Sequence, residues 1–284
     1  MSIKAHIALI GSGNLAQALG PALKAAGYKI DLVVSRPTAK SRRRAAALAE
    51  SVGAEAVVLN RFHPTAEIIW LCHTDDALAD TALLLSRKDG WKRKVVLHSS
   101  GALSSDAIAP LRRAGAFTAS LHPMMTFVAG STPDMRQVPF AVEGDREAVA
   151  AGRKIVRALH TKVFELRKEA KVLYHALGSF SSPMVVAALV TAERVGRAAG
   201  LSGKQLAGIM QPILQQTISN YLRKGAGAAF SGPIRRGDVQ TVQAHLRELE
   251  RVPGARDVYR TLVRSALMDL PSGNKEELLR LMNG

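Results

Sequence analysis

The stretch HIALIGSGNLAQALG, residues 6–20, is the part of the sequence that decides the fold. Its apolar beginning is typical of a buried strand, and the alanine and leucine spacing from residue 14 onward is typical of a helix. Gly11, Gly13 and Ala16 give the pattern G-x-G-x-x-A. The first glycine permits a tight turn, the second lets the backbone approach a pyrophosphate, and the small third residue lets helix and strand pack closely. The stretch therefore predicts a dinucleotide-binding turn.

The residues of this turn are the first predicted cofactor ligands. A helix N-terminus offers unpaired backbone N–H groups and a positive dipole, and both favour phosphate. We expect the pyrophosphate to lie against five consecutive residues, Gly11, Ser12, Gly13, Asn14 and Leu15. A glycine turn in an α/β protein that binds no ligand is the alternative interpretation.

The end of the second predicted strand indicates which dinucleotide binds. NAD is usually held by an Asp or Glu about 20 residues after the glycines, which accepts hydrogen bonds from the ribose hydroxyls. This chain has Ser35 and Arg36 there, and Asp31 lies at the start of the strand instead. A hydroxyl and a guanidinium suit a 2′-phosphate, which a carboxylate would repel. The cofactor predicted is therefore NADP, and the arginines at 42–44 either assist or form the solvated face of a helix.

Short apolar runs alternate with helical patterns through the first half of the chain. Uninterrupted apolar runs are expected where both faces of a parallel sheet are covered. We predict strands at residues 6–10, 30–34, 56–59, 68–72, 95–98, 117–121, 140–143 and 162–166, and helices at 14–26, 39–52, 77–86, 105–113 and 146–159. This order predicts an α/β domain over residues 1–166 with a Rossmann-like, doubly wound and mostly parallel sheet.

The pattern changes near residue 166, and residues 167–284 are predicted to form an all-α domain for substrate binding and dimerisation. Helices are expected at 168–199, 203–223, 238–249, 255–267 and 275–282. The first of these is long and mostly apolar, which favours burial, here against a second subunit. Pro183 should kink that helix or split it in two.

The net charge of +16 at pH 7 raises the question of nucleic-acid binding. The charge is spread evenly, with +8 in residues 1–165 and +8 in residues 166–284, and no aromatic residues interleave with it as a stacking platform requires. We therefore expect no nucleic-acid partner. The longest apolar run, residues 184–190, is far below the roughly 20 residues that cross a bilayer. The single cysteine, Cys72, excludes a disulfide within the chain, and a cytoplasmic protein without membrane contact is predicted.

Polar residues follow three neighbouring strands, at the edge where ligands bind in an open parallel sheet. Thr74 and Asp75 follow the fourth strand, Ser100 and Gly101 the fifth, and His122 the sixth. We expect Thr74, Asp75 and Gly101 to border the nicotinamide, and Ser100 and His122 to take part in catalysis. In the alternative interpretation, Thr74 or Asp75 caps the next helix and the histidine is structural.

The long helix supplies two further catalytic candidates, Lys171 and His175, which are four residues apart and share one helix face. A lysine whose pKa is lowered by burial, or a histidine, could protonate the atom left by hydride transfer to a carbonyl or imine. Alternatively, Lys171 binds an anionic substrate while His175 is the acid, or both residues only pack between the domains. No group of acidic and histidine residues has the spacing of a metal site, so no metal is predicted.

Five segments resemble those of one bacterial family. The segments are GSGNLA (11–16), HSSGALSSD (98–106), LHPMMTF (121–127), KVLYHALGSF (171–180) and SGPIRRGDVQTVQAHL (231–246). The family pairs a Rossmann-like NADP-oxidoreductase domain with a C-terminal helical domain of unknown function. The resemblance covers nearly the whole chain, and the segments at 121–127 and 231–246 are its most specific parts.

The layout is more distantly similar to pyrroline-5-carboxylate reductase and to 3-hydroxyisobutyrate and 6-phosphogluconate dehydrogenases. Several of those relatives use a lysine on the interdomain helix with an asparagine four residues later. Lys171 matches that lysine and His175 takes the place of the asparagine, but the glycine-rich segment that precedes the lysine is absent here. The resemblance implies the fold and the cofactor, and it transfers catalytic roles poorly.

The sequence predicts an NADP(H)-dependent reductase or dehydrogenase that acts on a small carbonyl or imine compound. The basic surface would suit an anionic substrate. The helical domain is expected to close the cleft and to pair two subunits as a homodimer, and Arg235 or Arg236 to reach the substrate. A non-catalytic NADP-binding sensor is the alternative, which a measurement of turnover would distinguish.

Overall fold

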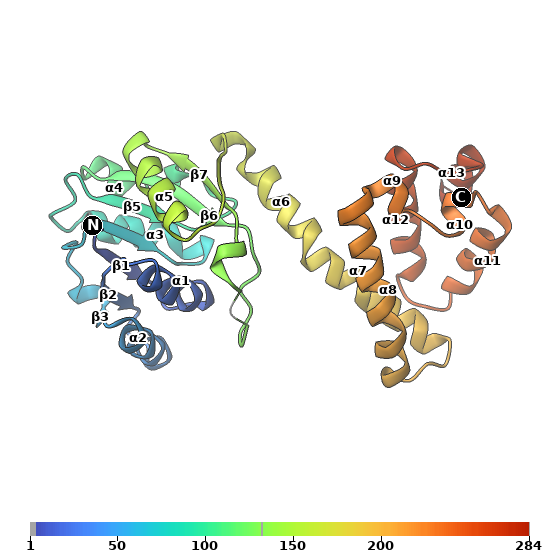
Figure 1. Ribbon diagram of the computed structural model, residues 1–284, viewed down its shortest axis with the longest axis horizontal. Helices are drawn as coiled ribbons and strands as arrows, with labels where there is room; N and C mark the ends of the chain where they lie inside the picture. Colours follow the sequence, from blue (N-terminus) through green and yellow to red (C-terminus); the bar gives the residue numbers. More distant parts are fainter. Residues whose placement is uncertain (1–3, 132, 284) are drawn as a thin grey trace. The chain divides into compact units, whose positions relative to one another are not determined.

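The first half of the chain forms an eight-stranded sheet in the computed structural model, which describes residues 4–131 and 133–283 (Figure 1). The strands lie in the order β3-β2-β1-β4-β5-β6-β7-β8, and neighbours are parallel except for β6 and β7. Their bounds are β1 Ile7–Ile10, β2 Ile30–Ser35, β3 Glu55–Val58, β4 Ile68–Leu71, β5 Val95–His98, β6 Phe117–Pro123, β7 Phe140–Gly144 and β8 Val163–Glu165. The strand order reverses between β1 and β4, which is where such sheets bind ligands.

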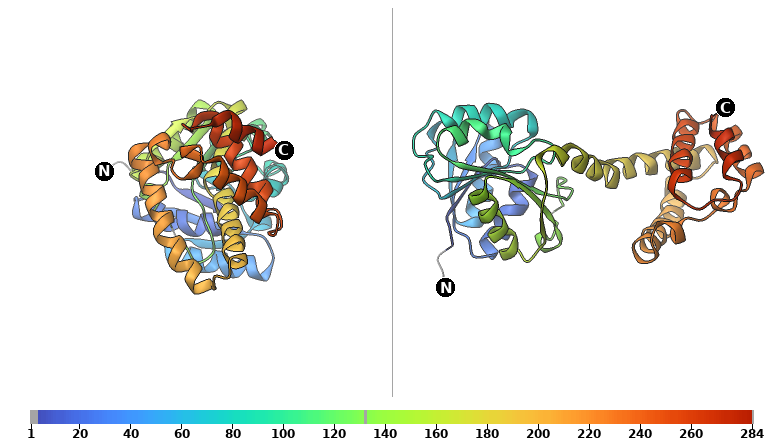
Figure 2. Two further views of the ribbon diagram at one scale, coloured as in Figure 1. Left: turned by 90° about the vertical axis from the view of Figure 1, so that its right-hand side faces the viewer. Right: turned by 90° about the horizontal axis from the view of Figure 1, so that it is seen from above.

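Helices cover both faces of the sheet (Figures 1 and 2). They are α1 Asn14–Ala25, α2 Ala39–Val52, α3 Asp75–Ser86, α4 Ala109–Arg113 and α5 Arg146–Ala158. Successive strand residues point to opposite sides. Ile7 and Leu9 of β1 therefore pack with α1, α2 and α5, whereas Ala8 and Ile10 pack with α3 and α4. The predicted doubly wound, mostly parallel sheet is confirmed.

The helix predicted at residues 105–113 forms as two elements. A 3₁₀ turn, η2, spans Ser105–Ile108, and α4 follows it. Pro110 has no N–H to donate to the preceding turn, and it lies at the start of α4, where that N–H would have no partner in the helix. The other predicted strands and helices are present with ends shifted by at most two residues, apart from the helix at 168–199.

The helix predicted at residues 168–199 is split at Pro183, which was one of the two predicted outcomes. After a 3₁₀ turn, η4 Lys168–Ala170, α6 runs from Lys171–Ser181 and α7 from Pro183–Ala198. Ser182 between them has φ −136° and ψ −83°, outside the helical region. The chain divides here into two compact units, Met1–Ser182 and Pro183–Gly284. The boundary predicted at residue 166 lies just after the end of β8, whereas the first unit continues to Ser182. The helix α6 belongs to the first unit, in which its residues Lys171 and Tyr174 are buried.

The second unit is helical throughout its described residues. After α7 its helices are α8 Gly203–Lys224, α9 Ala226–Ala229, α10 Pro233–Arg236, α11 Val239–Leu249, α12 Ala255–Asp269 and α13 Lys275–Asn283. Its core joins Val242 and Leu246 of α11 to Leu267 of α12 and Leu278 of α13. The SGPIRRGD segment packs against the residues that precede α13. Gly237 in this segment has φ +72° and lies against Gly273, and a Cβ on Gly237 would collide with the Gly273 backbone.

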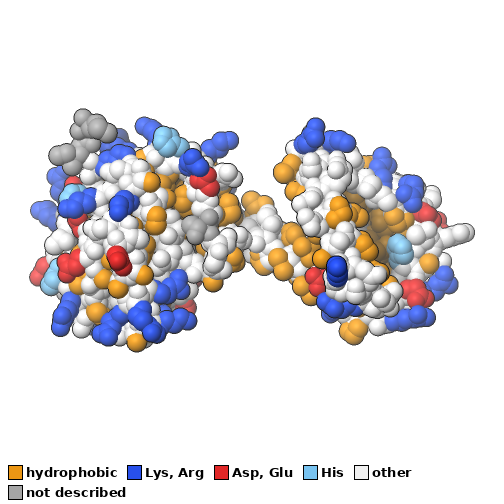
Figure 3. Space-filling view, turned by 60° about the horizontal axis from the view of Figure 1, so that its bottom comes forward, with side chains coloured by type: hydrophobic (Ala, Val, Ile, Leu, Met, Phe, Trp, Pro, Cys, Tyr) orange, Lys and Arg blue, Asp and Glu red, His pale blue; other side chains and the backbone are white. Residues whose placement is uncertain are grey.

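Large apolar side chains are exposed along α6, α7 and α8, and Figure 3 shows hydrophobic side chains gathered along α6 and over the helical unit. They include Leu173, Phe180, Val186, Ile213 and Leu222. The stretch Lys168–Ala198 is long and apolar enough to cross a membrane by length and composition, a criterion that core and interface helices also meet. We name the exposed apolar residues of α7 and α8, which belong to the second unit, the α7–α8 surface. Large apolar side chains gathered on a surface in this way mark an interaction site.

Candidate functional site

The glycine turn after β1 has the geometry that a bound pyrophosphate requires. Gly11 has φ +113°, and a Cβ on it would lie 2.6 Å from the carbonyl oxygen of Cys72. Around Gly13, in contrast, an added Cβ would meet no atom within 4 Å. Gly11 is therefore required by the fold itself, whereas Gly13 leaves open space in front of the N-terminus of α1, where free N–H groups favour phosphate.

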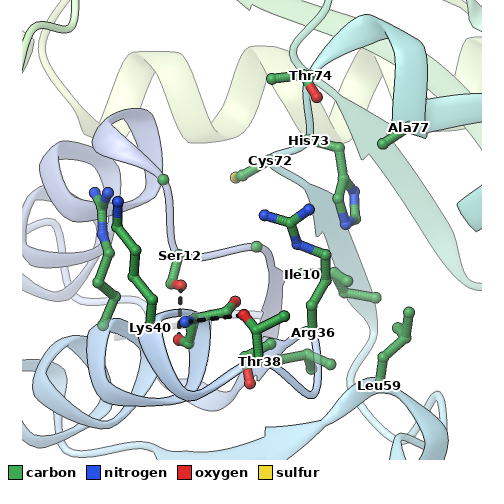
Figure 4. Close-up of a pocket in the computed structure, with 16 residues that line it drawn as sticks. Ile10, Ser12, Arg36, Thr38, Lys40, Leu59, Cys72, His73, Thr74 and Ala77 are labelled. Atoms are coloured by element: carbon green, nitrogen blue, oxygen red, sulfur yellow. Dashed lines mark hydrogen bonds between the residues drawn. The ribbon is translucent and has the colours of Figure 1, made fainter.

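A cavity of about 320 Å³ begins at this turn and extends along the ends of β2 and β4 (Figure 4). Three cationic side chains line it, Arg36, Lys40 and Arg44, and no aspartate or glutamate is among its described lining residues. Its remaining lining residues are Ile10, Gly11, Ser12, Gly13, Val34, Ser35, Thr38, Ser41, Leu59, Cys72, His73, Thr74 and Ala77. We call the part of the cavity that these three cationic side chains line its positive end, and α2 brings it beside the glycine turn.

The positive end is built by the loop between β2 and α2. Thr38 caps α2 by accepting a hydrogen bond from Ser41 N, and the Ser12 hydroxyl donates to Ser41 O at 3.3 Å. These bonds hold the first turn of α2 beside the glycine turn. Lys40, Ser41 and Arg44 thereby join the predicted pair Ser35 and Arg36. The spacing of the basic residues on α2 does not by itself distinguish a side that faces the cavity from a solvated side.

Two predicted cofactor ligands have side chains that contact other parts of the protein. The Asn14 amide donates to Phe127 O at 2.9 Å and accepts from the Arg44 guanidinium at 2.9 Å. Leu15 is partly buried against the sheet core. Asn14 therefore ties the α1 N-terminus to the segment that follows β6 and orients Arg44 at the cavity.

The end of β4 carries His73 and Thr74 into the same cavity, while Asp75 begins α3 outside its lining. Burial, followed by the nearby Arg36 charge, lowers the pKa of His73 to about 4. Its Nδ1 is fully buried and has no hydrogen-bond partner among the described residues. Figure 4 shows the His73 ring beside the Arg36 guanidinium. His73 was not among the predicted ligands, although its place at a strand end was the signal that could have identified it.

A second cluster of polar side chains lies at the ends of β5 and β6. The Lys171 side chain is 2% exposed, and its ammonium donates to Ser100 O at 3.0 Å and to Ser120 Oγ at 2.6 Å. The nearest carboxylate oxygen, from Glu143, is 4.0 Å away and Glu143 also accepts two hydrogen bonds from Ser105. Burial lowers the pKa of Lys171 to about 8, against the opposing effect of Glu143.

The two predicted histidines do meet. His122 and His175 have ring centroids 6.2 Å apart at 78°. Both rings lie close to Gly101, where an added Cβ would be 2.6 Å from His175 Cδ2 and 2.8 Å from His122 Nε2. Burial, with the charges of Lys171 and His175, lowers the pKa of His122 to about 4. The sheet edge therefore presents neutral imidazole beside the Ser100–Gly101 backbone.

Tyr174, which was not among the predicted site residues, completes this cluster. Tyr174 is 8% exposed, and its hydroxyl lies 2.9 Å from His122 Nδ1. Burial raises its pKa to about 12. The Ser100 hydroxyl accepts from Leu103 N and so stabilises the turn after β5. We name Ser100, Gly101, His122, Tyr174 and His175 the histidine cluster.

Arg235 and Arg236, predicted to reach a substrate, are exposed in α10, and Arg236 lies 3.9 Å from Asp238. Asp238 caps α11 by accepting from Thr241 N. No group of three or more His, Cys, Asp or Glu side chains that could hold a metal ion occurs in residues 4–131 and 133–283.

Comparisons with known proteins agree with this arrangement. Residues 2–123 match the Rossmann-like domain family, and residues 138–266 match a domain of unknown function, DUF2520. None of the curated proteins matches the chain in sequence.

Solved structures of similar fold cover nearly the whole chain. A candidate NADP oxidoreductase of Bacteroides fragilis is 25% identical with a TM-score of 0.77, over 92% of this chain and 97% of that one. Protein TM1727 of Thermotoga maritima is 25% identical with a TM-score of 0.72, over 98% and 100%. An imine reductase of Myxococcus stipitatus in complex with NADP+ is 17% identical with a TM-score of 0.64, over 93% and 94%. This chain thus joins a Rossmann-like domain to a DUF2520 domain, as its sequence motifs indicated.

Proposed function

We propose that this protein is an NADP(H)-dependent oxidoreductase. The observation that carries the proposal is the cavity beside the glycine turn, which offers three cationic side chains and no carboxylate among its described lining residues. A pyrophosphate fits the open space at Gly13, and a 2′-phosphate fits the positive end at Arg36, Lys40 and Arg44. The relatives described as NADP oxidoreductases, or solved with NADP+, support the same cofactor.

We propose that the reaction takes place at the histidine cluster. In this fold a dinucleotide that starts at the β1 turn extends toward the carboxyl ends of the following strands, where Thr74 and Gly101 lie. The bound cofactor supplies a hydride there, and the substrate is a small carbonyl or imine compound. His122 and His175 face the Ser100–Gly101 backbone and contact the substrate atom that gains a proton or accepts a hydrogen bond.

We propose a positioning role for Lys171 instead of direct contact with the substrate. Its ammonium is buried and donates to the Ser100 carbonyl, which follows β5, and to the Ser120 hydroxyl on β6. This charge fixes the Ser100 carbonyl and the Ser120 hydroxyl, and so the spacing of β5 and β6, on which Gly101 and His122 depend.

The proposal includes a second copy of this chain as the occupant of the α7–α8 surface. Exposed side chains such as Val186, Ile213 and Leu222 would otherwise remain in water, at a cost of about 25 cal/mol per Å² of apolar area. A homodimer in the cytoplasm covers them without a membrane. Sedimentation equilibrium tests this assignment, and a monomer at micromolar concentration would contradict it.

Binding and turnover test the proposed function separately. Calorimetric titration with NADPH and NADH should show binding with preference for NADPH. Incubation with NADPH and a panel of small ketones, ketoacids and cyclic imines should then consume cofactor in a substrate-dependent way. No heat with either nicotinamide cofactor would refute the proposal, and NADPH binding without consumption would support the non-catalytic sensor instead.

A further inference from the structure

The two ring nitrogens of His122 have different surroundings. Nδ1 lies 2.9 Å from the Tyr174 hydroxyl. Nε2 has no hydrogen-bond partner among the described residues and is not one of the fully buried unpaired atoms, so it is open to solvent. The same nitrogen faces Gly101, where an added Cβ would lie 2.8 Å from it. His122 therefore has one nitrogen directed into the protein and one directed at the end of β5.

The phenol proton of Tyr174 determines which nitrogen carries the ring proton. Tyr174 is buried, and His122 is its hydroxyl's hydrogen-bond partner among the described residues. The raised pKa of Tyr174 keeps the phenol protonated at neutral pH. The Nδ1–H tautomer would leave the phenol donor without an acceptor, which shifts the equilibrium between the two tautomers of the His122 ring by about tenfold or more. The phenol consequently donates to Nδ1, which leaves the single ring proton on Nε2.

The surroundings keep the ring neutral. The ionisable groups around it are His98, Lys171, His175 and the Glu143 carboxylate, and Lys171 and His175 both lower the pKa of His122. Lys171 and Glu143 form an ion pair with 4.0 Å between the ammonium and the carboxylate, and Glu143 also accepts two hydrogen bonds from Ser105. A substrate atom near Nε2 thus meets a neutral donor.

We propose that Tyr174 is a positioning residue that holds His122 in the Nε2–H tautomer, and that Nε2–H donates to a substrate atom with a free lone pair. A carbonyl oxygen or a neutral imine nitrogen meets this requirement. A protonated iminium does not, because its nitrogen has no lone pair. The inference rests on the proposed function for the identity of the substrate, but the tautomer can be measured without turnover.

The chain contains a matched control for the tautomer. His245 Nδ1 lies 3.1 Å from the Tyr259 hydroxyl, with ring centroids 5.8 Å apart at 87°, compared with 5.4 Å and 89° for His122 and Tyr174. This second pair is exposed and belongs to the helical unit. Tyr259→Phe therefore removes the same hydroxyl far from the histidine cluster in the sequence.

Long-range ¹H–¹⁵N correlation spectra of the full chain, labelled at histidine, report the tautomer directly. The His122 signals are assigned by their loss in His122→Asn. At pH 7.5 we expect His122 to be neutral with its proton on Nε2, to become a tautomer mixture in Tyr174→Phe, and to be unchanged in Tyr259→Phe. A proton on Nδ1 in the wild type, or an unchanged tautomer in Tyr174→Phe, would overturn the proposal.

A pair of substrates tests the donor role. A cyclic imine and its N-methylated iminium ion differ in the lone pair that Nε2–H needs, and we expect NADPH consumption with the first and at least about tenfold less with the second. Equal rates would overturn the donor role. An Nε2–H tautomer in a protein that binds no NADPH would refute the proposed function alone, and an Nδ1–H tautomer in one that binds it would refute this inference alone.

Discussion

Arg36→Gln should separate NADPH from NADH. Arg36 lines the positive end of the cavity, where the described lining residues include no carboxylate to compete for its guanidinium. A hydrogen bond between charged groups contributes about 1.5–3 kcal/mol. Arg36 is exposed, so we expect the lower end, about 1.5 kcal/mol, which corresponds to about tenfold weaker NADPH binding. NADH has no 2′-phosphate, and its affinity should change by less than about threefold.

Arg42→Gln is the matched control, because Arg42 is exposed on α2 and does not line the cavity. It removes the same charge at a similar place in the sequence and should change neither affinity measurably. Isothermal titration at low and at high salt provides the assay, since screening should reduce the preference for NADPH in the wild type. Equal losses of NADPH and NADH affinity in Arg36→Gln, or an equal effect of Arg42→Gln, would refute the 2′-phosphate role.

Four further outcomes follow from the site. Gly13→Val should abolish binding of both cofactors while leaving the melting temperature unchanged, because no protein atom lies within 4 Å of an added Cβ. Gly11→Ala should lower the free energy of unfolding in urea by about 2 kcal/mol, because of the 2.6 Å approach to Cys72 O and the positive φ. His175→Ala should lower turnover and leave the NADPH dissociation constant unchanged, and the reverse pattern would contradict its placement. The pKa of Lys171 falls from 10.5 to about 8 on folding, so the unfolded chain binds more protons than the folded chain between pH 8 and pH 10.5. The free energy of unfolding of the wild type should therefore rise with pH across that window relative to that of Lys171→Met. A difference between the two proteins that does not change with pH would contradict the burial of Lys171.

The parts of the fold that the sequence predicted are those set by local physical requirements. A glycine at position 11 signals a backbone that other residues avoid, and its φ of +113° meets that expectation. Apolar runs such as residues 68–71 are uninterrupted because α-helices cover both faces of the sheet. Pro183 could not continue a hydrogen-bonded helix, and α6 ends before it.

Other features depend on contacts between distant residues, which no local pattern contains. Tyr174 and His122 are 52 residues apart in the chain, and their hydrogen bond exists only because α6 returns to the end of β6. The inward side of α2 likewise depends on Ser12 and Thr38, which fix its first turn beside the glycine turn. The sequence therefore predicted the cavity-lining residues on the strand ends better than those on the neighbouring helix.

The spacing of Lys171 and His175 shows why a shared helix face does not mean a shared role. One helical turn, about 5.4 Å, separates the two residues along the axis. Lys171 opens α6 beside Ser100 O and Ser120 Oγ and is buried, whereas His175, one turn later, reaches the outer side of Gly101 and is exposed. A single turn thus carries the helix from the interior of the sheet to its edge. For that reason we expect substitution of Lys171 to act on stability and on the spacing of β5 and β6, and substitution of His175 to act on the reaction itself.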